Sequence, residues 1–423
     1  MSSQRPSEQQ TPPAPRTVLT FVPYYLPGYK SGGPVRSVAN LVSRLGNDLR
    51  FVIVTADRDS GDRAPYPHLS AAEPHRIGNA DVIYVDVSRS RARHIAALVR
   101  RLQPHVIYLN SFFSRPFSLN IIMLRHLRLI PWLPIVLAPR GEFSPGALQV
   151  KAGRKRAFVA ASRALRLHRD VLWQASTALE ADHIRRAVGA VERDGSSAIV
   201  VAPIIASPEA AASDCTAPAT AHGKRPGHLR VAFLSRISKK KNLLGALQIL
   251  QGVHGSVELS IYGPIEDEPY WRKCRELIDD LPANVRATYR GAVAAADVAA
   301  VLAGHDLFFL PTLGENYGHV IREALAAATP VLISDQTPWR NLAAAQVGWD
   351  LPLDRPDAFR AVLDTCVGMD STSFAGWSER AAAYAWQHAA DDSAVEASRR
   401  LFSAAAAGRS AIAIGESGMI NAS

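Results

Sequence analysis

Two glutamates, Glu315 and Glu323, stand eight residues apart in the stretch GENYGHVIREALAAATPV, which covers residues 314–331. Glu315 follows an apolar run that ends at Pro311-Thr312, and Glu323 falls inside a helical pattern that begins after Gly318. Ionised carboxylates are strong acceptors for hydroxyl groups, and the first N–H groups of a helix form an anion site. The pattern therefore predicts a cleft for a ligand with phosphates and hydroxyls, such as a nucleoside diphosphate sugar. A dipole-stabilised glutamate beside an exposed helix glutamate would give the same sequence without a ligand.

A basic loop supplies the opposite charge. The segment SRISKKKN, residues 235–242, follows an apolar strand pattern and opens a helix, so that Arg236 and Lys241 stand where a diphosphate could be clamped. Cations at a helix N-terminus are unfavourable unless an anion lies between them. A solvated basic turn is the alternative. The chain contains neither a Walker phosphate loop nor a GxGxxG fingerprint.

The elements that must position these residues repeat twice along the chain. In the first half, short and nearly continuous apolar runs alternate in part with helical patterns at 34–45 and 94–102, which is typical of strands buried on both faces of a parallel sheet. After residues 206–228, a stretch rich in Ala, Ser, Pro and Gly, the alternation restarts with helical patterns at 242–253, 269–280 and 319–328. The expected strands are 17–22, 50–56, 81–87, 105–111, 134–141, 170–176 and 198–204, and then 229–237, 257–263, 285–291, 306–312 and 330–335.

This alternation predicts an α/β fold of two Rossmann-like, doubly wound domains that face each other across a cleft. The expected divisions are a disordered N-terminus (1–16), an N-terminal domain (17–205), a linker (206–228), a C-terminal domain (229–376), closing helices (377–404) and a flexible tail (405–423).

Composition indicates the class of protein and the compartment in which it is expected. The 423 residues are 48% hydrophobic and 20% charged, and no apolar run reaches the length of about 18 residues that a membrane-spanning helix needs. The first sixteen residues are polar and proline-rich and lack a signal-peptide core. Cys215, Cys274 and Cys366 show neither metal-ligand spacing nor a disulfide framework, which suits a reducing cytoplasm.

The net charge of +10 is unevenly distributed. Residues 1–203 hold 28 Lys and Arg against 14 Asp and Glu, whereas the remaining residues hold 20 against 24. The basic half suggests an anionic partner, which could be nucleic acid, an anionic membrane surface or a phosphate-bearing lipid. The alternative is a basic surface that faces only water. Residues 151–169 show the pattern of a basic amphipathic helix, which suits an anionic bilayer.

Together these motifs resemble retaining glycosyltransferases of the GT-B fold, of the group 1 type known as glycosyltransferase family four, over residues 17–404. The resemblance rests on the E-x7-E pattern of Glu315 and Glu323 with the following ALAAATPVL and TPW, on FLSRISKKKN, and on SIYGP at 260–264. It implies that the domain 17–205 lies on the acceptor side and that the domain 229–376 binds the nucleotide sugar. It also implies that Glu323 binds the ribose hydroxyls and Glu315 the donor-sugar hydroxyls, with Arg236 and Lys241 on the diphosphate. The residues implied in catalysis are Arg236, Lys241 and Glu315, and those implied in donor binding are Gly32, Gly33, Gly263, Asn316, Tyr317, Gly318 and Glu323.

The first half extends the resemblance. YYLPGYKSGGP at 24–34 resembles the glycine-rich loop after the first strand, where Gly32 and Gly33 let the backbone approach the ligand. Other segments (55–62, 108–114 and 138–158) resemble a subgroup tied to exopolysaccharide and capsule assembly. Many relatives have a histidine where this chain has Asn110 or Arg140. The expected acceptor-side residues are Asn110, Arg140 and Gly141.

The expected function is therefore a cytoplasmic glycosyltransferase, peripheral on the inner face of the membrane. It would move a sugar from a UDP- or GDP-sugar to a growing, lipid-linked polysaccharide or lipopolysaccharide with retention of configuration. No cofactor and no metal are expected, because Asp57-Arg58-Asp59 lies away from the phosphate loop. One alternative is a nucleotide-sugar epimerase on a similar fold. It would need acid and base groups around the sugar, and no such set of residues is evident in the sequence. A nucleic-acid-binding protein would need a recognisable module in the basic half, so no nucleic acid is expected.

Overall fold

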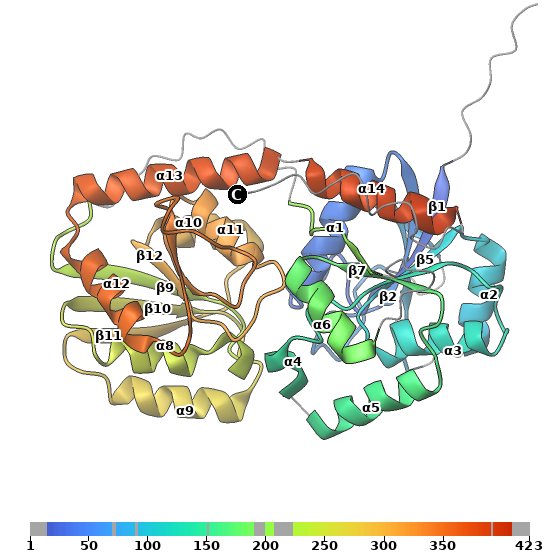
Figure 1. The fold of residues 1–423 in the computed structure, drawn as a ribbon, viewed down its shortest axis with the longest axis horizontal. Helices are drawn as coiled ribbons and strands as arrows, with labels where there is room; N and C mark the ends of the chain where they lie inside the picture. Colours follow the sequence, from blue (N-terminus) through green and yellow to red (C-terminus); the bar gives the residue numbers. More distant parts are fainter. Residues whose placement is uncertain are drawn as a thin grey trace, which may run out of the picture.

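The computed structural model describes residues 15–69, 73–88, 92–149, 152–189, 199–206, 223–390 and 392–407. The first 14 residues, most of the expected linker and the end of the expected tail lie outside the described residues, as do Cys215 and Lys151. The chain forms two α/β units that lie side by side, the N-terminal unit in blue to green and the C-terminal unit in yellow to orange (Figure 1).

The N-terminal unit is built on an eight-stranded sheet with the order β3-β4-β2-β1-β5-β6-β7-β8. The described pairings are parallel except for β3 with β4, which is antiparallel. The seven apolar segments of the first half all contribute strands, and the sequence missed β3, a short edge strand that is not apolar. The strands are β1 (Arg16–Phe21), β2 (Leu49–Ala56), β3 (His75–Ile77), β4 (Ala80–Val85), β5 (Val106–Asn110), β6 (Ile135–Ala138), β7 (Val171–Ala175) and β8 (Ile199–Val201).

Helices cover both faces of this sheet, because its central strands are apolar on both sides. The helix α1 contributes to the hydrophobic core on one face, and α2, α3 and α6 contribute to the core on the other. The helices of this unit are α1 (Gly33–Leu45), α2 (Ala92–Leu102), α3 (Asn120–His126), α4 (Pro145–Gln149), α5 (Ala152–Ala164) and α6 (Ala178–Val188).

The C-terminal unit has a six-stranded parallel sheet with the order β11-β10-β9-β12-β13-β14. The five predicted strands are present, and β14 adds an edge strand that the sequence missed. The strands are β9 (His228–Leu234), β10 (Ser256–Tyr262), β11 (Val285–Gly291), β12 (Leu307–Leu310), β13 (Val331–Ser334) and β14 (Gly348–Leu351). The helices are α8 (Leu243–Leu250), α9 (Glu268–Asp279), α10 (Val298–Ala303), α11 (His319–Ala326) and α12 (Pro356–Gly368).

Two C-terminal helices connect the units. The helix α13 (Ser371–Ala390) lies along the C-terminal unit, and α14 (Ser393–Ala406) returns to the N-terminal unit, where Phe402 packs edge-on against Phe51 and Tyr108 (Figure 1). The expected boundary between 376 and 377 is wrong, since α13 is continuous there. The start of the expected tail is also wrong, because α14 continues through residue 406.

The end of the expected linker also belongs to the folded C-terminal unit. Lys224 is 4% exposed, and its ammonium donates hydrogen bonds to the backbone carbonyls of His228 and Val367, at 2.7 and 3.2 Å. A buried ammonium is stable only when its donors are satisfied in this way. The residues from 223 to 228 are therefore anchored to α12 and β9.

Candidate functional site

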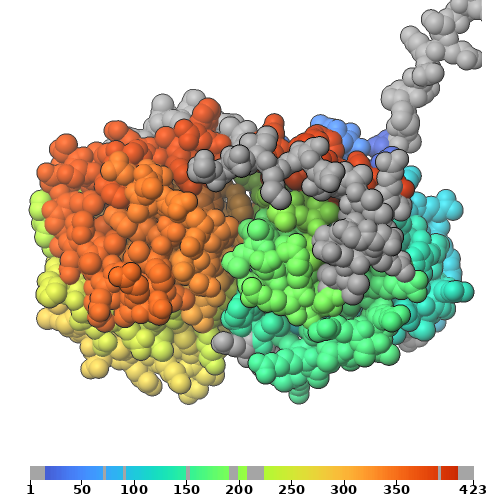
Figure 2. All heavy atoms as spheres, viewed as in Figure 1, coloured from blue at the N-terminus to red at the C-terminus, as the bar shows by residue number. Residues whose placement is uncertain are grey.

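The two units meet along a seam, with orange and yellow atoms on one side and green atoms on the other (Figure 2). Ser176, after β7, donates a hydrogen bond to the side-chain oxygen of Asn316, after β12, at 3.0 Å when the Asn316 amide is oriented with its NH2 group toward Glu180. A Cβ atom on Gly141 would lie 3.2 Å from the Cβ of Asn316, and one on Gly146 would lie 3.2 Å from the carbonyl of Leu313. The predicted cleft therefore lies at this seam, where the two units are in contact.

The basic loop between β9 and α8 is tied to the loop that carries Glu315. Lys239–Lys241 form a single 3-10 turn, and the carbonyl of Lys240 accepts a hydrogen bond from the amide of Leu313 at 2.8 Å. The ammonium of Lys241 forms an ion pair with the Glu315 carboxylate. Both side chains of this pair are only 12% exposed, so the pair is poorly screened by water.

The surroundings keep Glu315 ionised. Burial acts to raise the pKa of Glu315, but the charges of Lys241 and Lys240 and the hydrogen bond from Lys241 outweigh it, and the pKa is lowered. Burial is also the main reason why the pKa of Lys240 is lowered, against the opposing effect of Glu315. Glu315 is therefore a carboxylate acceptor in a low-dielectric cleft, where hydrogen bonds to its charge are strong.

Arg236 lies in the same loop but is more open to water. Its guanidinium donates to Glu266 at 2.9 Å, and 40% of the side chain is exposed. Gly263 determines how this loop can run, because a Cβ atom there would lie 1.9 Å from the carbonyl oxygen of Ser235. Its φ of 131° also disfavours other residues. The structure thus gives Gly263 a packing role under the basic loop.

The segment before α11 forms the other half of this region. Gly318 is the N-cap residue of α11, with a φ of 76° that favours glycine. The ring of Tyr317 packs against His319 and Trp339, with centroids 4.7 and 5.9 Å away. The predicted donor residue Tyr317 therefore contributes its side chain to an aromatic cluster, which holds the amino end of α11 in place.

Asn316 faces the N-terminal unit. When its amide is oriented with the NH2 group toward Glu180, it donates to that carboxylate at 2.9 Å. Glu180 is 4% exposed and also accepts from the amides of Gly141 and Ser176, at 2.6 and 2.7 Å. Three donors around one carboxylate satisfy its charge. Asn316 and Gly141 are thus brought together by Glu180, a residue that the sequence interpretation did not single out.

Glu323 is the second glutamate of the pattern, and it contacts the N-terminal unit directly. Its carboxylate forms an ion pair with Arg36, which lies in the first turn of α1. Next to this pair, Ser37 Oγ lies 3.0 Å from His319 Nε2. Burial, then the charges of Arg36, Arg322 and Arg140, lower the pKa of His319 to about 3, so the imidazole is neutral at neutral pH.

Arg36, His319 and Arg322 were missed by the sequence interpretation. The signal for Arg36 was its place three residues after the predicted glycine loop. Gly33 lies close to α11, because a Cβ atom there would lie 3.4 Å from His319 Cδ2. Gly32 has a φ of 64°, and a Cβ atom there would meet open space, so a ligand could approach its backbone.

Arg140, which the sequence predicts as an acceptor-side residue, donates to Asn110 Oδ1 at 2.9 and 3.1 Å and to the Tyr108 hydroxyl at 2.6 Å. Asn110 is 4% exposed, and its Nδ2 has no hydrogen-bond partner among the described residues. Arg140 and Asn110 are therefore held together by hydrogen bonds. Burial is the main reason why the pKa of Tyr108 is raised, so its hydroxyl stays neutral.

Asp57 and Asp59 take part in loop structure. Asp59 accepts hydrogen bonds from the amides of Tyr29 and Lys30 at 2.7 and 3.0 Å, and Asp57 pairs with Arg58 at 2.7 Å. The described part of the chain holds no group of three or more His, Cys, Asp or Glu residues placed to bind a metal ion. It also contains no helix with the length and apolarity required to cross a bilayer.

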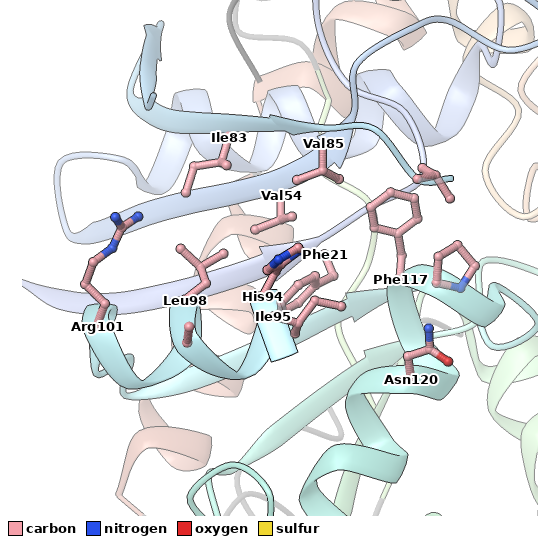
Figure 3. Close-up of a pocket in the computed structure, with 13 residues that line it drawn as sticks. Phe21, Val54, Ile83, Val85, His94, Ile95, Leu98, Arg101, Phe117 and Asn120 are labelled. Atoms are coloured by element: carbon pink, nitrogen blue, oxygen red, sulfur yellow. The ribbon is translucent and has the colours of Figure 1, made fainter. Parts of the chain in front are cut away.

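Two cavities differ in size and character. A cavity of about 30 Å³ lies at the seam, lined among others by Glu315, Lys240 and Gly141. A cavity of about 280 Å³ lies inside the N-terminal unit between α2 and the sheet, with Arg101 at one end and Phe117 and Asn120 at the other (Figure 3). The larger cavity is mainly apolar and carries none of the predicted donor residues. The chemistry of the cleft therefore concerns the smaller one and the polar seam around it.

Solved structures with the same two-unit arrangement are GT-B glycosyltransferases. A glycosyltransferase of Rickettsia africae is 13% identical, with 93% of this chain and 99% of that chain covered and a TM-score of 0.66. HepE of Anabaena, in complex with UDP and glucose, is 15% identical over 93% of this chain and 100% of its own, with a TM-score of 0.62. Sucrose-phosphate synthase of Thermosynechococcus elongatus is 15% identical over 92% and 100%, with a TM-score of 0.66. The protein has the GT-B fold.

A family model matches a segment of the chain that lies mainly in the C-terminal unit. Residues 219–365 match the model of the family Glycosyl transferases group 1, which confirms the family resemblance of the sequence motifs over this segment. A stretch of 168 residues is 33% identical to phosphatidyl-myo-inositol mannosyltransferase of Mycolicibacterium smegmatis. That match covers 37% of this chain and 41% of the mannosyltransferase.

Proposed function

We propose that the protein is a retaining glycosyltransferase that moves a sugar from a UDP- or GDP-sugar to a growing, lipid-linked polysaccharide or lipopolysaccharide. The observation that carries this proposal is the pair of carboxylates around the amino end of α11. Glu315 and Glu323 are each held by a cation, Lys241 and Arg36 respectively. Sugar and ribose hydroxyls are suitable ligands for such carboxylates.

The donor's leaving group is a nucleoside diphosphate, whose developing charge needs stabilisation. Lys241 and Arg236 lie in one loop, and fixed cations in a poorly solvated cleft are an effective way to stabilise such charge. These cations are the reason to propose a reaction without a metal ion or cofactor. HepE, which has this fold, was solved with UDP and glucose, and that supports a nucleotide-sugar donor here.

The N-terminal unit supports the lipid-linked acceptor. The cavity under α2, of about 280 Å³, is lined mainly by apolar side chains, so it suits a stretch of hydrocarbon chain. One of its ends lies at Arg101, and the preceding residue, Arg100, donates to the carbonyl of Leu129 at 2.7 Å. Leu129 belongs to an exposed loop at the end of α3, so the cavity approaches the surface beside apolar side chains.

That surface supports a peripheral position on the inner face of the cytoplasmic membrane. Leu127, Trp132 and Leu165 are 58%, 53% and 61% exposed. Arg125 links Trp132 to the segment after Leu165, since its guanidinium lies 4.7 Å from the centre of the Trp132 ring and donates to the carbonyl of Arg169 at 2.8 Å. Exposed apolar side chains among cations suit an anionic bilayer.

The cations of the basic helix α5 are not all available to a membrane surface. Arg154 and Arg156 of α5 are exposed, but Lys155 donates to the carbonyl of Ala147 at 2.6 Å and lies 5.0 Å from the ring of Phe113. Lys155 therefore packs against its own domain, and of these three cations we propose only Arg154 and Arg156 as bilayer contacts.

The test is a panel of UDP- and GDP-sugars, scored for thermal stabilisation and for hydrolysis or transfer. We expect one nucleotide class to stabilise the protein and one donor to be turned over, with the anomeric configuration of the product read by NMR. Glu315→Gln should lose turnover, and Glu276→Gln, an exposed glutamate on α9, is the matched control. The proposal fails if no nucleoside diphosphate stabilises the protein, or if an oligonucleotide does so instead.

A further inference from the structure

Arg36 links the glycine loop to the ribose-side carboxylate. It follows Gly33 by three residues in the first turn of α1, and its guanidinium pairs with Glu323 across the seam. The two side chains are 34% and 21% exposed, so the pair is partly shielded from water. Under the proposed function, ribose hydroxyls would take this carboxylate, and Arg36 would then need another partner.

The seam around Arg36 has more cations than carboxylates. Arg322 is 7% exposed, and its Nε and Nη1 have no hydrogen-bond partner among the described residues. Burial, followed by the charge of Arg322, lowers the pKa of Arg36, and His319 is neutral beside them. Of the nearby carboxylates, Glu180 is already bound to backbone amides. A shielded guanidinium without a counter-charge is costly, so an anion is needed once Glu323 is engaged elsewhere.

The groups next to Arg36 determine which anion can lie there. The helix α1 begins at Gly33, with open space beside Gly32, and the first N–H groups of a 13-residue helix favour negative charge. Arg36 lies one turn along the same helix, within reach of a ligand at those N–H groups. A diphosphate fits both features, since guanidinium groups bind phosphate oxygens bidentately.

We propose that Arg36 is a donor-phosphate ligand supplied by the N-terminal domain, which holds Glu323 until the ribose takes that carboxylate and then binds the diphosphate. This inference rests on the proposed function. It makes the seam responsive to the donor, because one ligand would satisfy both members of an ion pair that joins the two domains.

The test compares Arg36→Met with Arg44→Met, an arginine on the same helix that pairs with Asp392 of α14. Isothermal titration calorimetry on the full chain would measure UDP and GDP directly, and uridine and guanosine in competition with them. For Arg36→Met we expect about 10- to 100-fold weaker binding of the diphosphate, the loss of one charge-assisted contact. The nucleoside should bind as well as before or more tightly, because Glu323 is released. Arg44→Met should match the wild type.

Each other outcome overturns the proposal. If Arg36→Met binds the diphosphate as tightly as the wild type or more tightly, Arg36 only competes for Glu323. If diphosphate and nucleoside lose affinity equally, the effect is on the fold of the site and not on phosphate. If the wild type binds neither UDP nor GDP, the proposed function itself fails, and this is seen before any variant is compared. Arg36→Lys should recover part of the diphosphate affinity, as a point charge does.

Discussion

Replacing Lys241 with methionine tests whether the cleft keeps Glu315 ionised. Methionine retains most of the length and apolar contact of lysine but removes its charge. The Glu315 carboxylate would then remain in a site where only 12% of its side chain is exposed, with Lys240 as its nearest remaining cation. We expect the variant to fold but to lose stability at neutral pH.

The magnitude follows from the exposure of the pair. Two unit charges about 4 Å apart interact by about 4 kcal/mol at an effective dielectric constant of about 20. Breaking one partner of a buried pair costs about 3–5 kcal/mol, because the other charge stays desolvated. Since Lys240 still compensates part of the charge, we expect a loss of about 3 kcal/mol at pH 7, at the lower end of that range.

The pH dependence gives the sharper assay. The pKa of Glu315 is lowered in the folded protein, so its ionisation stabilises the fold above the unfolded value of about 4.3 and this contribution is lost as the pH falls through the folded pKa. In Lys241→Met the pKa of Glu315 should rise, because burial is then less opposed. The stability difference from the wild type should therefore be largest at neutral pH and shrink as the pH falls and Glu315 becomes protonated.

Urea unfolding between pH 4 and pH 8, followed by tryptophan fluorescence, measures this difference. The control is the same substitution in a Glu315→Gln background, where the pH-dependent part should disappear. A penalty that is the same at both ends of the pH range, or that keeps its pH dependence in the Glu315→Gln background, would refute the account of a charged and paired Glu315.

Three further outcomes are expected. Gly263→Ala should destabilise the C-terminal unit by more than the roughly 1–3 kcal/mol that backbone strain costs, because the new Cβ would collide with Ser235. The control is Gly291→Ala, at a φ of 84° but with open space around the Cβ, which should cost only the strain. Thermal unfolding of the two variants measures the difference. Turnover should persist in excess EDTA, and activity restored only by added Mn²⁺ or Mg²⁺ would contradict the cationic site. Binding to anionic vesicles should weaken as salt is added, because electrostatic attraction is screened over about 10 Å at 0.1 M. A double Arg→Gln variant on α5 should weaken this binding more than a matched double variant on α13 and α14. The α5 changes are Arg154→Gln and Arg156→Gln, and the control changes are Arg380→Gln and Arg400→Gln.

The strands could be predicted because parallel sheets leave a local signal. A segment such as FVIVTA, which lies in β2, is apolar on both faces and needs no knowledge of its neighbours to be identified. The edge strands β3 and β14 were missed because they are short and contain charged residues, β3 being HRI and β14 GWDL. The boundary at 376 was wrong because α13 is one continuous helix of the C-terminal unit: Trp377 stacks on Trp349, and Ala381 and Ala385 belong to the core of that unit.

The partners in the cleft could not be predicted, because they are separated along the chain. Arg36 and Glu323 are 287 positions apart, and Ser176 and Asn316 are 140 positions apart. The sequence indicated that Glu323 faces a cleft, but which cation of the basic half meets it depends on how the two sheets dock. Gly263 shows the same limit on a smaller scale, since its role comes from the approach of another strand's end.

The two glutamates differ in a way that their spacing does not reveal. The partner of Glu315 belongs to the same unit, so rotation of one unit against the other leaves that pair intact. The partner of Glu323 belongs to the opposite unit, so the same rotation separates it. Under the proposed function, a movement that separates the two units would therefore release Glu323 for the ribose hydroxyls while Glu315 stays paired with Lys241 and charged.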